Sequence, residues 1–224
     1  CIGTEAGDAL DTTNSSVAIG AHAMSTETTS GGSVALGVYA LQDQNVASSN
    51  NVAVGYQSGY NLTTGTDSVY VGYLAGGVGV ITGSANVAIG KGAAQKATGM
   101  SSSVFVGQLS GGNGVIDSAN NTCMGYATGY ALTSGANNVL IGANAGLFLT
   151  AGGQNVVIGS GAMDAADTGT TRTNCVAIGT SALTGQTSNV SYCTAVGTSA
   201  LAAQNADVKN TAIGGLAGDA IEGG

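Results

Sequence analysis

The residues able to do chemistry are few and widely spaced in this chain. Histidine occurs once, as His22, and the twelve acidic side chains are scattered along the sequence without a recurring pair. General acid–base catalysis needs two placed groups whose pKa values are driven apart. We therefore expect no enzymatic activity, no catalytic residues and a plain surface position for His22.

Metal-binding patterns are equally sparse. The four cysteines, Cys1, Cys123, Cys175 and Cys193, lack the paired spacing that zinc sites use. The stretch 111–117 resembles a calcium-binding nonapeptide, but its Asp117 falls one place late and the pattern does not recur, so we interpret it as a turn. The sequence predicts no metal and no cofactor.

Tyrosine is the residue type best suited to a contact surface. Four tyrosines lie one or two residues after a glycine that ends a short apolar run, and two more begin the second half of the repeat; the six are Tyr39, Tyr56, Tyr73 and Tyr126, then Tyr60 and Tyr130. Exposed aromatic side chains suit contacts with sugars or proteins, so these six are candidate surface-binding residues. The alternative is that they pack along the turn between neighbouring repeats.

A short repeat positions all of these residues. The run NVAVG at 51–55 returns as NVAIG at 86–90, NVLIG at 138–142 and NVVIG at 155–159. Its closing glycine recurs thirteen times at steps of 17, 18 or once 20 residues: Gly3, Gly20, Gly37, Gly55, Gly72, Gly90, Gly107, Gly125, Gly142, Gly159, Gly179, Gly197 and Gly214. Such a period is typical of stacked repeat architectures whose units contact only their neighbours. We expect residues 1–224 to be a single repeat domain and a section of a longer fibre.

Composition supports a hydrogen-bonded ladder and excludes several partners. Proline is absent, as expected where nearly every segment joins a ladder. The net charge is −8 with four basic residues, which argues against a nucleic-acid partner. No run of about 20 apolar residues occurs, so we expect no membrane insertion in this segment.

The pattern within each repeat predicts the architecture. The residues one and three before the glycine are branched or long apolar residues or threonine and share one face, and the residue between them, often alanine, points to the other. A strand that is apolar on both faces is covered on both, as in parallel sheets. We predict an all-β parallel β-roll or β-solenoid of about 13 coils of 17–18 residues, each with a weaker second strand. A symmetric oligomer is expected to cover the small-residue face near its axis, and an outward loop is expected around 163–173.

Two columns of the repeat carry further predictions. The closing glycine is expected at a close backbone approach or a positive φ. The position four before it is Asn or Ser in most copies, which predicts a hydrogen-bonded ladder. Cys175 and Cys193 occupy this column on successive coils, within reach of a disulfide. The alternative is that two thiols have replaced serine there.

The repeat also resembles known families. Ser16-Val17-Ala18-Ile19-Gly20 and its copies, followed by Ala, Ser or Thr three residues later, resemble the head repeats of trimeric autotransporter adhesins, and residues 51–65 are similar to the longer repeats of bacteriophage tail fibres. The resemblance covers essentially the whole chain. It implies a left-handed parallel β-roll, intertwined or side by side in a homotrimer, on a virion or cell surface. The coils are several residues longer than in the adhesin heads, which favours the phage type.

These observations lead to one main hypothesis and two alternatives. The main hypothesis is a non-enzymatic structural and adhesive extracellular fibre that presents or forms a receptor-binding surface. Its partners would be two further copies of itself and a glycan or protein of a host cell surface. The alternatives are a trimeric autotransporter adhesin head and a polysaccharide-degrading β-solenoid spike.

Overall fold

The computed structural model describes residues 1–10, 15–28, 31–44, 49–164, 171–185, 189–203 and 209–220. These residues form an all-β parallel solenoid, and none of them is helical. The chain divides into two compact units, unit 1 (Cys1–Asp117) and unit 2 (Ser118–Gly224). Within the described ranges no helix is long and apolar enough to span a bilayer.

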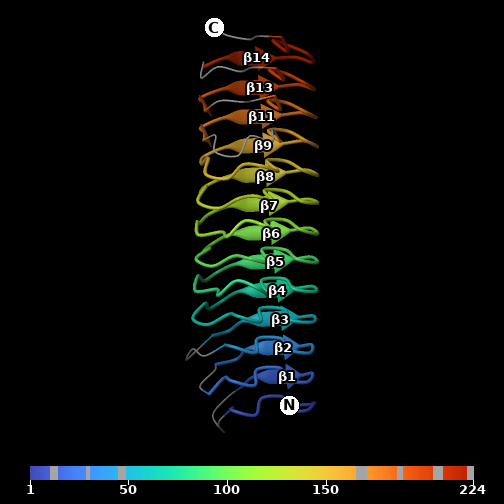
Figure 1. Cartoon of the computed structure of the whole chain (residues 1–224), viewed down its shortest axis with the longest axis vertical. Helices are drawn as coiled ribbons and strands as arrows, with labels where there is room; N and C mark the ends of the chain where they lie inside the picture. The colour runs from blue at the N-terminus through green and yellow to red at the C-terminus, as the bar shows by residue number, and fades with distance from the viewer. Residues whose placement is uncertain are drawn as a thin grey trace. The chain divides into compact units, whose positions relative to one another are not determined.

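Unit 1 contributes one three-residue strand per coil. The strands are β1 (Val17–Ile19), β2 (Val34–Leu36), β3 (Val52–Val54), β4 (Val69–Val71), β5 (Val87–Ile89) and β6 (Val104–Val106). Each pairs in parallel with the next, in chain order, as Figure 1 shows. The register joins equivalent repeat positions, such as Ala18 with Ala35. The predicted parallel solenoid is therefore confirmed in this unit.

Unit 2 repeats the arrangement and adds a second, shorter ladder. Its main strands are β7 (Thr122–Met124), β8 (Val139–Ile141), β9 (Val156–Ile158), β11 (Val176–Ile178), β13 (Thr194–Val196) and β14 (Thr211–Ile213). They pair in parallel, β9 with β11 and β11 with β13. Two further strands, β10 (Arg172–Thr173) and β12 (Val190–Ser191), pair in parallel beside them.

The glycine that ends each strand is required by both geometry and contact. Gly142 has φ +126, a conformation that L side chains rarely adopt, and a Cβ added there would lie 2.7 Å from the carbonyl carbon of Gly159 on the next coil. Real Cβ atoms do not approach backbone atoms this closely, so a side chain would force the two coils apart. Both predicted reasons for the glycine column, a positive φ and a close approach, are confirmed.

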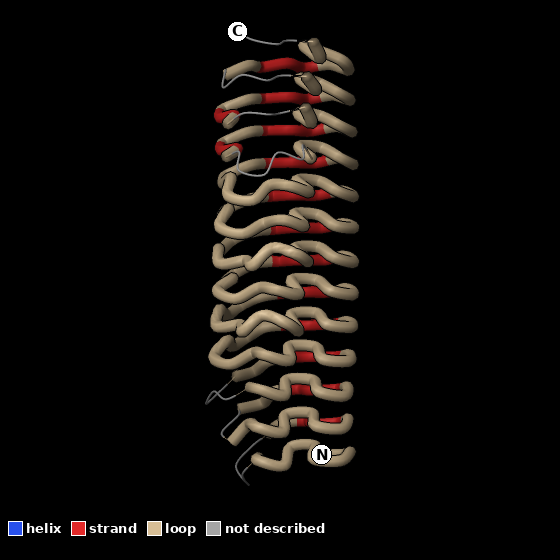
Figure 2. Tube along the Cα trace, in the orientation of Figure 1, coloured by secondary structure: helices blue, strands red, loops and turns tan. Residues whose placement is uncertain are grey.

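The second half of the coil is mostly turn, and the predicted weaker second strand is largely wrong. Figure 2 shows strands on one side of each coil and loops closing the other. In the described residues the exceptions are the β10–β12 ladder, the bridge between Leu62 and Ile81, and the bridge residues Ser101 and Ala119. Left-handed residues such as Gly59 (φ +59) interrupt any extended run there. Coils still share hydrogen bonds on this side, as when Thr63 N donates to Ile81 O at 3.0 Å.

The expected outward loop around 163–173 falls mainly on residues 165–170, which lie outside the described residues. The end of that range is not an outward loop, because Arg172 and Thr173 form β10 and the Arg172 side chain is buried. The Arg172 carbonyl accepts a hydrogen bond from Asn155 Nδ2 at 2.8 Å, which holds this segment against the coil interior.

The expected placement of the two strand faces was wrong. The middle residue of each strand, such as Ala18, Ala53 or Ala88, is fully buried inside its own coil, and the residues on either side face outward. The coil is thin, so its interior takes small strand residues together with side chains from the second half, among them Leu62 and Ile81. The small-residue column is therefore interior and does not face an oligomer axis.

Side-chain size is balanced in the coil interior. Where the middle strand residue is large, as at Phe105, the turn position six residues later is glycine, here Gly111. A Cβ on Gly111 would lie 2.7 Å from the Phe105 ring, so the ring occupies that space. In other coils the strand residue is small and the same turn position holds a large buried side chain, as with Ala35 and Leu41. Where both positions are small, as at Ala53 and Gly59, side chains of the adjacent coils, Leu41 among them, lie against the space.

The Asn and Ser column forms the predicted ladder, and it also bridges the coil. Asn138 Oδ1 accepts from the backbone N of Asn155 on the next coil at 3.1 Å. Its Nδ2 donates across the coil to the carbonyl oxygen of Gly152 at 2.9 Å. Asn51 and Asn86 make the same cross-coil bond in unit 1. These amides satisfy buried backbone groups that no strand ladder reaches.

Candidate functional site

Unit 1 places a row of four rings along the corner that follows the strand. We call His22, Tyr39, Tyr56 and Tyr73 the aromatic row; each lies one or two residues after a strand-ending glycine. The His22 and Tyr39 rings stack at 5.0 Å between centroids, Tyr39 and Tyr56 meet edge to face at 6.1 Å, and Tyr56 and Tyr73 stack at 5.5 Å. Neighbouring coils therefore bring rings 17 residues apart in sequence into contact.

Charged groups lie at both ends of the aromatic row. The Glu5 carboxylate oxygen Oε2 is 3.0 Å from His22 Nδ1 at one end. At the other end Lys91 Nζ lies 6.0 Å from the centre of the Tyr73 ring, at the limit of a cation–π contact. The row is thus acidic at its first coil and basic at its last.

Two rings of the row are accessible to solvent although they stack on each other. Tyr56 is 43% exposed and Tyr73 is 49% exposed, while one face of each lies against the other ring. A ligand would meet aromatic rings that are already packed together. Pre-packed aromatic side chains lose little conformational entropy on binding, which favours them as contact residues.

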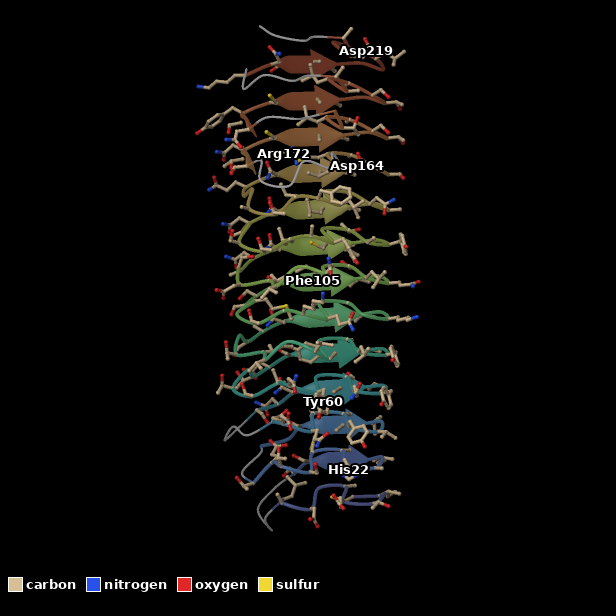
Figure 3. All side chains as sticks on the ribbon, in the orientation of Figure 1. His22, Tyr60, Phe105, Asp164, Arg172 and Asp219 are labelled. Atoms are coloured by element: carbon tan, nitrogen blue, oxygen red, sulfur yellow. The ribbon has the colours of Figure 1, made fainter. Side chains whose placement is uncertain are left out.

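The six predicted tyrosines do not form one surface. Tyr60 joins the row by an edge-to-face contact with Tyr39 at 6.2 Å, and Figure 3 labels it together with His22. Tyr126 and Tyr130 belong to unit 2, and no ring contact of theirs is found among the described residues. The structure therefore brings together Tyr39, Tyr56, Tyr60 and Tyr73.

The sequence analysis did not anticipate the contacts of two rings, His22 and Tyr192. His22 was expected to be a plain surface residue, but it stacks on Tyr39, and its position two after the glycine, the same as that of Tyr39, was the available signal. In unit 2, Tyr192 is 58% exposed with Lys209 Nζ 5.1 Å from its ring centre. Tyr192 and Lys209 both stand five positions before a repeat glycine.

A second candidate surface is the outward face of the sheet. The strand residues that flank the buried middle position are aliphatic, methionine or threonine, and they are half-buried or exposed. We call these two columns the outer stripe; its exposed members are Val17, Ile19 and Ile89 in unit 1 and Met124, Ile141, Ile158 and Ile213 in unit 2. None of the strand residues in these columns is charged.

A buried polar cluster lies in the interior of unit 1. Gln44 Nε2 donates to Glu27 Oε1 at 2.6 Å and to Ser33 Oγ at 3.0 Å, and it also bonds Ser49 Oγ. All four side chains are fully buried. A single hydrogen-bonded carboxylate of this kind offers packing and polar satisfaction, whereas acid–base chemistry needs a second placed group.

Burial is the main cause of the pKa shifts of two titratable groups in unit 2, Asp164 and Cys123. Burial raises the pKa of Asp164, and the positive charge of Arg172 opposes that rise; Figure 3 labels both residues. Burial also raises the pKa of the Cys123 thiol well above its usual range. Among the described residues, no three His, Cys, Asp or Glu side chains gather where they could hold a metal ion.

The two cysteines of the Asn and Ser column lie side by side on successive coils. Cys175 and Cys193 are buried, and both are thiols in this structure. Their hydrogen bond to each other, together with burial, raises the pKa of Cys175. The disulfide between them stays a prediction.

Comparisons with protein-family models, with curated proteins and with solved structures gave no match to this chain.

Proposed function

We propose that this chain is a non-enzymatic structural and adhesive segment of an extracellular fibre, of the bacteriophage tail-fibre type, that assembles as a homotrimer. The observation that carries the proposal is the outer stripe. Each main strand turns two uncharged side chains outward, most of them aliphatic and three of them threonine, so each unit presents a long uncharged face to solvent. Monomeric proteins rarely leave contiguous apolar surface of this kind uncovered.

Further copies of the same chain are the occupants that best fit this face. The outer stripe has the spacing of the coils, about 4.8 Å, and an identical chain carries the same columns at the same spacing. Coil can then pack on coil along the whole face, in a closed symmetric assembly. The strand columns of the stripe hold no charge that would select a differently charged partner. Three copies are chosen because the sequence resembles trimeric fibre repeats.

The adhesive part of the proposal rests on the aromatic row. It lies on the corner after the strand, so it stays accessible when the sheet face is covered. Its rings are fixed against one another, and Tyr56 and Tyr73 expose close to half of their surface. A host-surface glycan or protein would meet a preorganised aromatic edge flanked by Lys91.

Light scattering of the full chain tests the assembly. We expect a molecular mass three times 21.4 kDa. Ile141→Gln, in the outer stripe, should lower the mass, whereas Val115→Gln should not, because Val115 is exposed outside the stripe. A folded wild-type monomer would contradict the trimer.

Binding of labelled chain to an array of mammalian glycans and bacterial surface polysaccharides tests adhesion. We expect the double variant Tyr56→Ala/Tyr73→Ala to lose binding and Tyr192→Ala to keep it. Equal binding by both variants would remove the aromatic row from the proposal. Release of saccharide from the polysaccharides would contradict a non-enzymatic role and favour a depolymerising spike.

A further inference from the structure

The corner that carries Cys175 and Cys193 is held in register on both sides. Before the cysteines, β10 pairs with β12, with Thr173 opposite Ser191. After them, β11 pairs with β13, with Val176 opposite Thr194. Parallel strands lie about 4.8 Å apart, so this double ladder places the two Cα atoms inside the 4.4–6.8 Å range of disulfides.

Backbone hydrogen bonds fix the same corner. Val176 N donates to Cys193 O at 2.8 Å, and Tyr192 N donates to Thr173 O at 3.1 Å. Asn174 and Tyr192, the residues before the cysteines, both take a left-handed φ, 58° and 61°. The two chains turn in the same way, so both side chains enter the coil interior together, where both are buried.

We propose that Cys175 and Cys193 form a disulfide that joins two successive coils of unit 2 when the protein folds in an oxidising environment. The reaction is thiol–disulfide exchange with a small-molecule disulfide such as oxidised glutathione. One cysteine thiolate attacks the glutathione disulfide and releases one glutathione; the second thiolate then attacks the mixed disulfide and releases the other. The protein loses two protons and two electrons, and the glutathione disulfide gains them.

The surroundings of the two thiols determine when the bond can form. The thiolate is the attacking species, and the pKa of Cys175 is raised by its hydrogen bond with Cys193 and by burial. Both side chains are closed to solvent in the folded coil. The exchange therefore belongs to the folding phase, before the coil closes, and the completed bond is protected from reductants afterwards.

The bond would close a loop of 18 positions between Cys175 and Cys193. Restricting the unfolded chain by a loop of this length changes the unfolding equilibrium constant by about a hundredfold. Such a covalent tie would join two successive coils of unit 2 in addition to their strand ladders. The inference does not depend on the proposed adhesive function.

The test is refolding of the full chain with the double substitution Cys1→Ser/Cys123→Ala, which leaves only the column pair. One sample refolds with oxidised and reduced glutathione, and one with reductant alone. Peptide mapping without reduction should find the fragments around Cys175 and Cys193 cross-linked in the first sample only. The unfolding equilibrium constant of the sample refolded with oxidised glutathione should be about a hundredfold lower than that of the reduced sample.

A matched control adds Cys175→Ser/Cys193→Ser, because serine fills this column in other coils, such as at Ser68 and Ser103. The control should unfold like the reduced sample under both conditions. The proposal would be overturned if Cys175 and Cys193 could both be alkylated after oxidative refolding and denaturation. So would a cross-linked protein that unfolds as readily as the serine control.

Discussion

The cross-coil amide of Asn138 gives the sharpest test of how the coil interior is held together. Asn138 serves two buried backbone groups: its Oδ1 accepts from Asn155 N, and its Nδ2 donates to Gly152 O. Neither of these backbone groups has another partner among the described hydrogen bonds. Asn138→Ala therefore leaves both backbone groups buried in the coil without a hydrogen-bond partner.

The expected loss of stability follows from the two hydrogen bonds that the substitution removes. A buried backbone group left without a hydrogen bond costs about 1–3 kcal/mol, so Asn138→Ala should destabilise unit 2 by about 2–6 kcal/mol. Asn138→Ser should cost about half as much. In the serine coils the hydroxyl takes over one of the two bonds, as when Ser68 Oγ accepts from Asn86 N at 3.0 Å. Serine cannot reach across the coil, so Gly152 O stays unsatisfied.

Native-state hydrogen exchange tests the bond from Asn155 N to Asn138 Oδ1, because the method follows backbone amide hydrogens. In Asn138→Ala the amide of Asn155 loses its acceptor and should exchange about 10- to 100-fold faster, while Asn138→Ser should keep its protection. The Gly159 amide is a control in the same coil, because it donates to Ile141 O at 2.8 Å in both variants. Equal exchange of the Asn155 amide in the alanine and serine variants would refute this account of the column.

Two further predictions follow from the described geometry. Gly142→Ala should destabilise unit 2 by about 3 kcal/mol or more, because its Cβ would lie 2.7 Å from Gly159 backbone atoms at a φ of +126. Gly215→Ala, whose Cβ would meet no atom closer than 4.0 Å, should change the denaturation midpoint little; equal midpoints for the two variants would count against the close approach. Burial raises the pKa of Tyr70 from 10.0 to about 12, so the stability it confers is full below pH 10 and falls by about 2–3 kcal/mol as pH rises to 12. Tyr70→Phe should lose less stability over that range in denaturant titrations, and an unchanged pH dependence would contradict the assignment.

The repeat period was enough to predict the parallel solenoid and its register. Equivalent residues such as Val139 and Val156 are opposite each other because each coil returns to the same place after 17 residues. The glycine column was also predictable, because only a residue without a Cβ permits its φ and its contact. These features depend on local chemistry that every copy repeats.

The direction of the two strand faces could not be derived from the alternation alone. Both faces are apolar, so the pattern at Val87, Ala88 and Ile89 fits either orientation. The width of the coil decides which face is interior, and that width is set by left-handed corners at ordinary residues such as Leu74 (φ +55). Nothing in a leucine indicates a left-handed conformation. The combination of a large middle strand residue, Phe105, with a glycine six residues later, Gly111, was the signal in the sequence that the middle residue points inward.

The aromatic row was only partly visible for a related reason. Tyr39 stands two residues after its glycine and Tyr56 stands one after, so they seemed to occupy different columns. The rings are long enough to meet despite that offset, at 6.1 Å. Tyr126 has the same sequence position as Tyr73 but no tyrosine at that position in the next repeat, where Ala143 stands instead. A row therefore forms only where adjacent coils each carry an aromatic ring at this corner, whichever ring it is.

The way bulk is shared in the interior couples each coil to its neighbours. The coil with Ala35 and Leu41 places its large side chain in its own turn. At Ala53 and Gly59, where both positions are small, Leu41 and Tyr70 of the adjacent coils lie against the space. Interior substitutions are therefore expected to be compensated either within the coil or in the coil next to it, and a transplanted coil is expected to need neighbours of matching bulk.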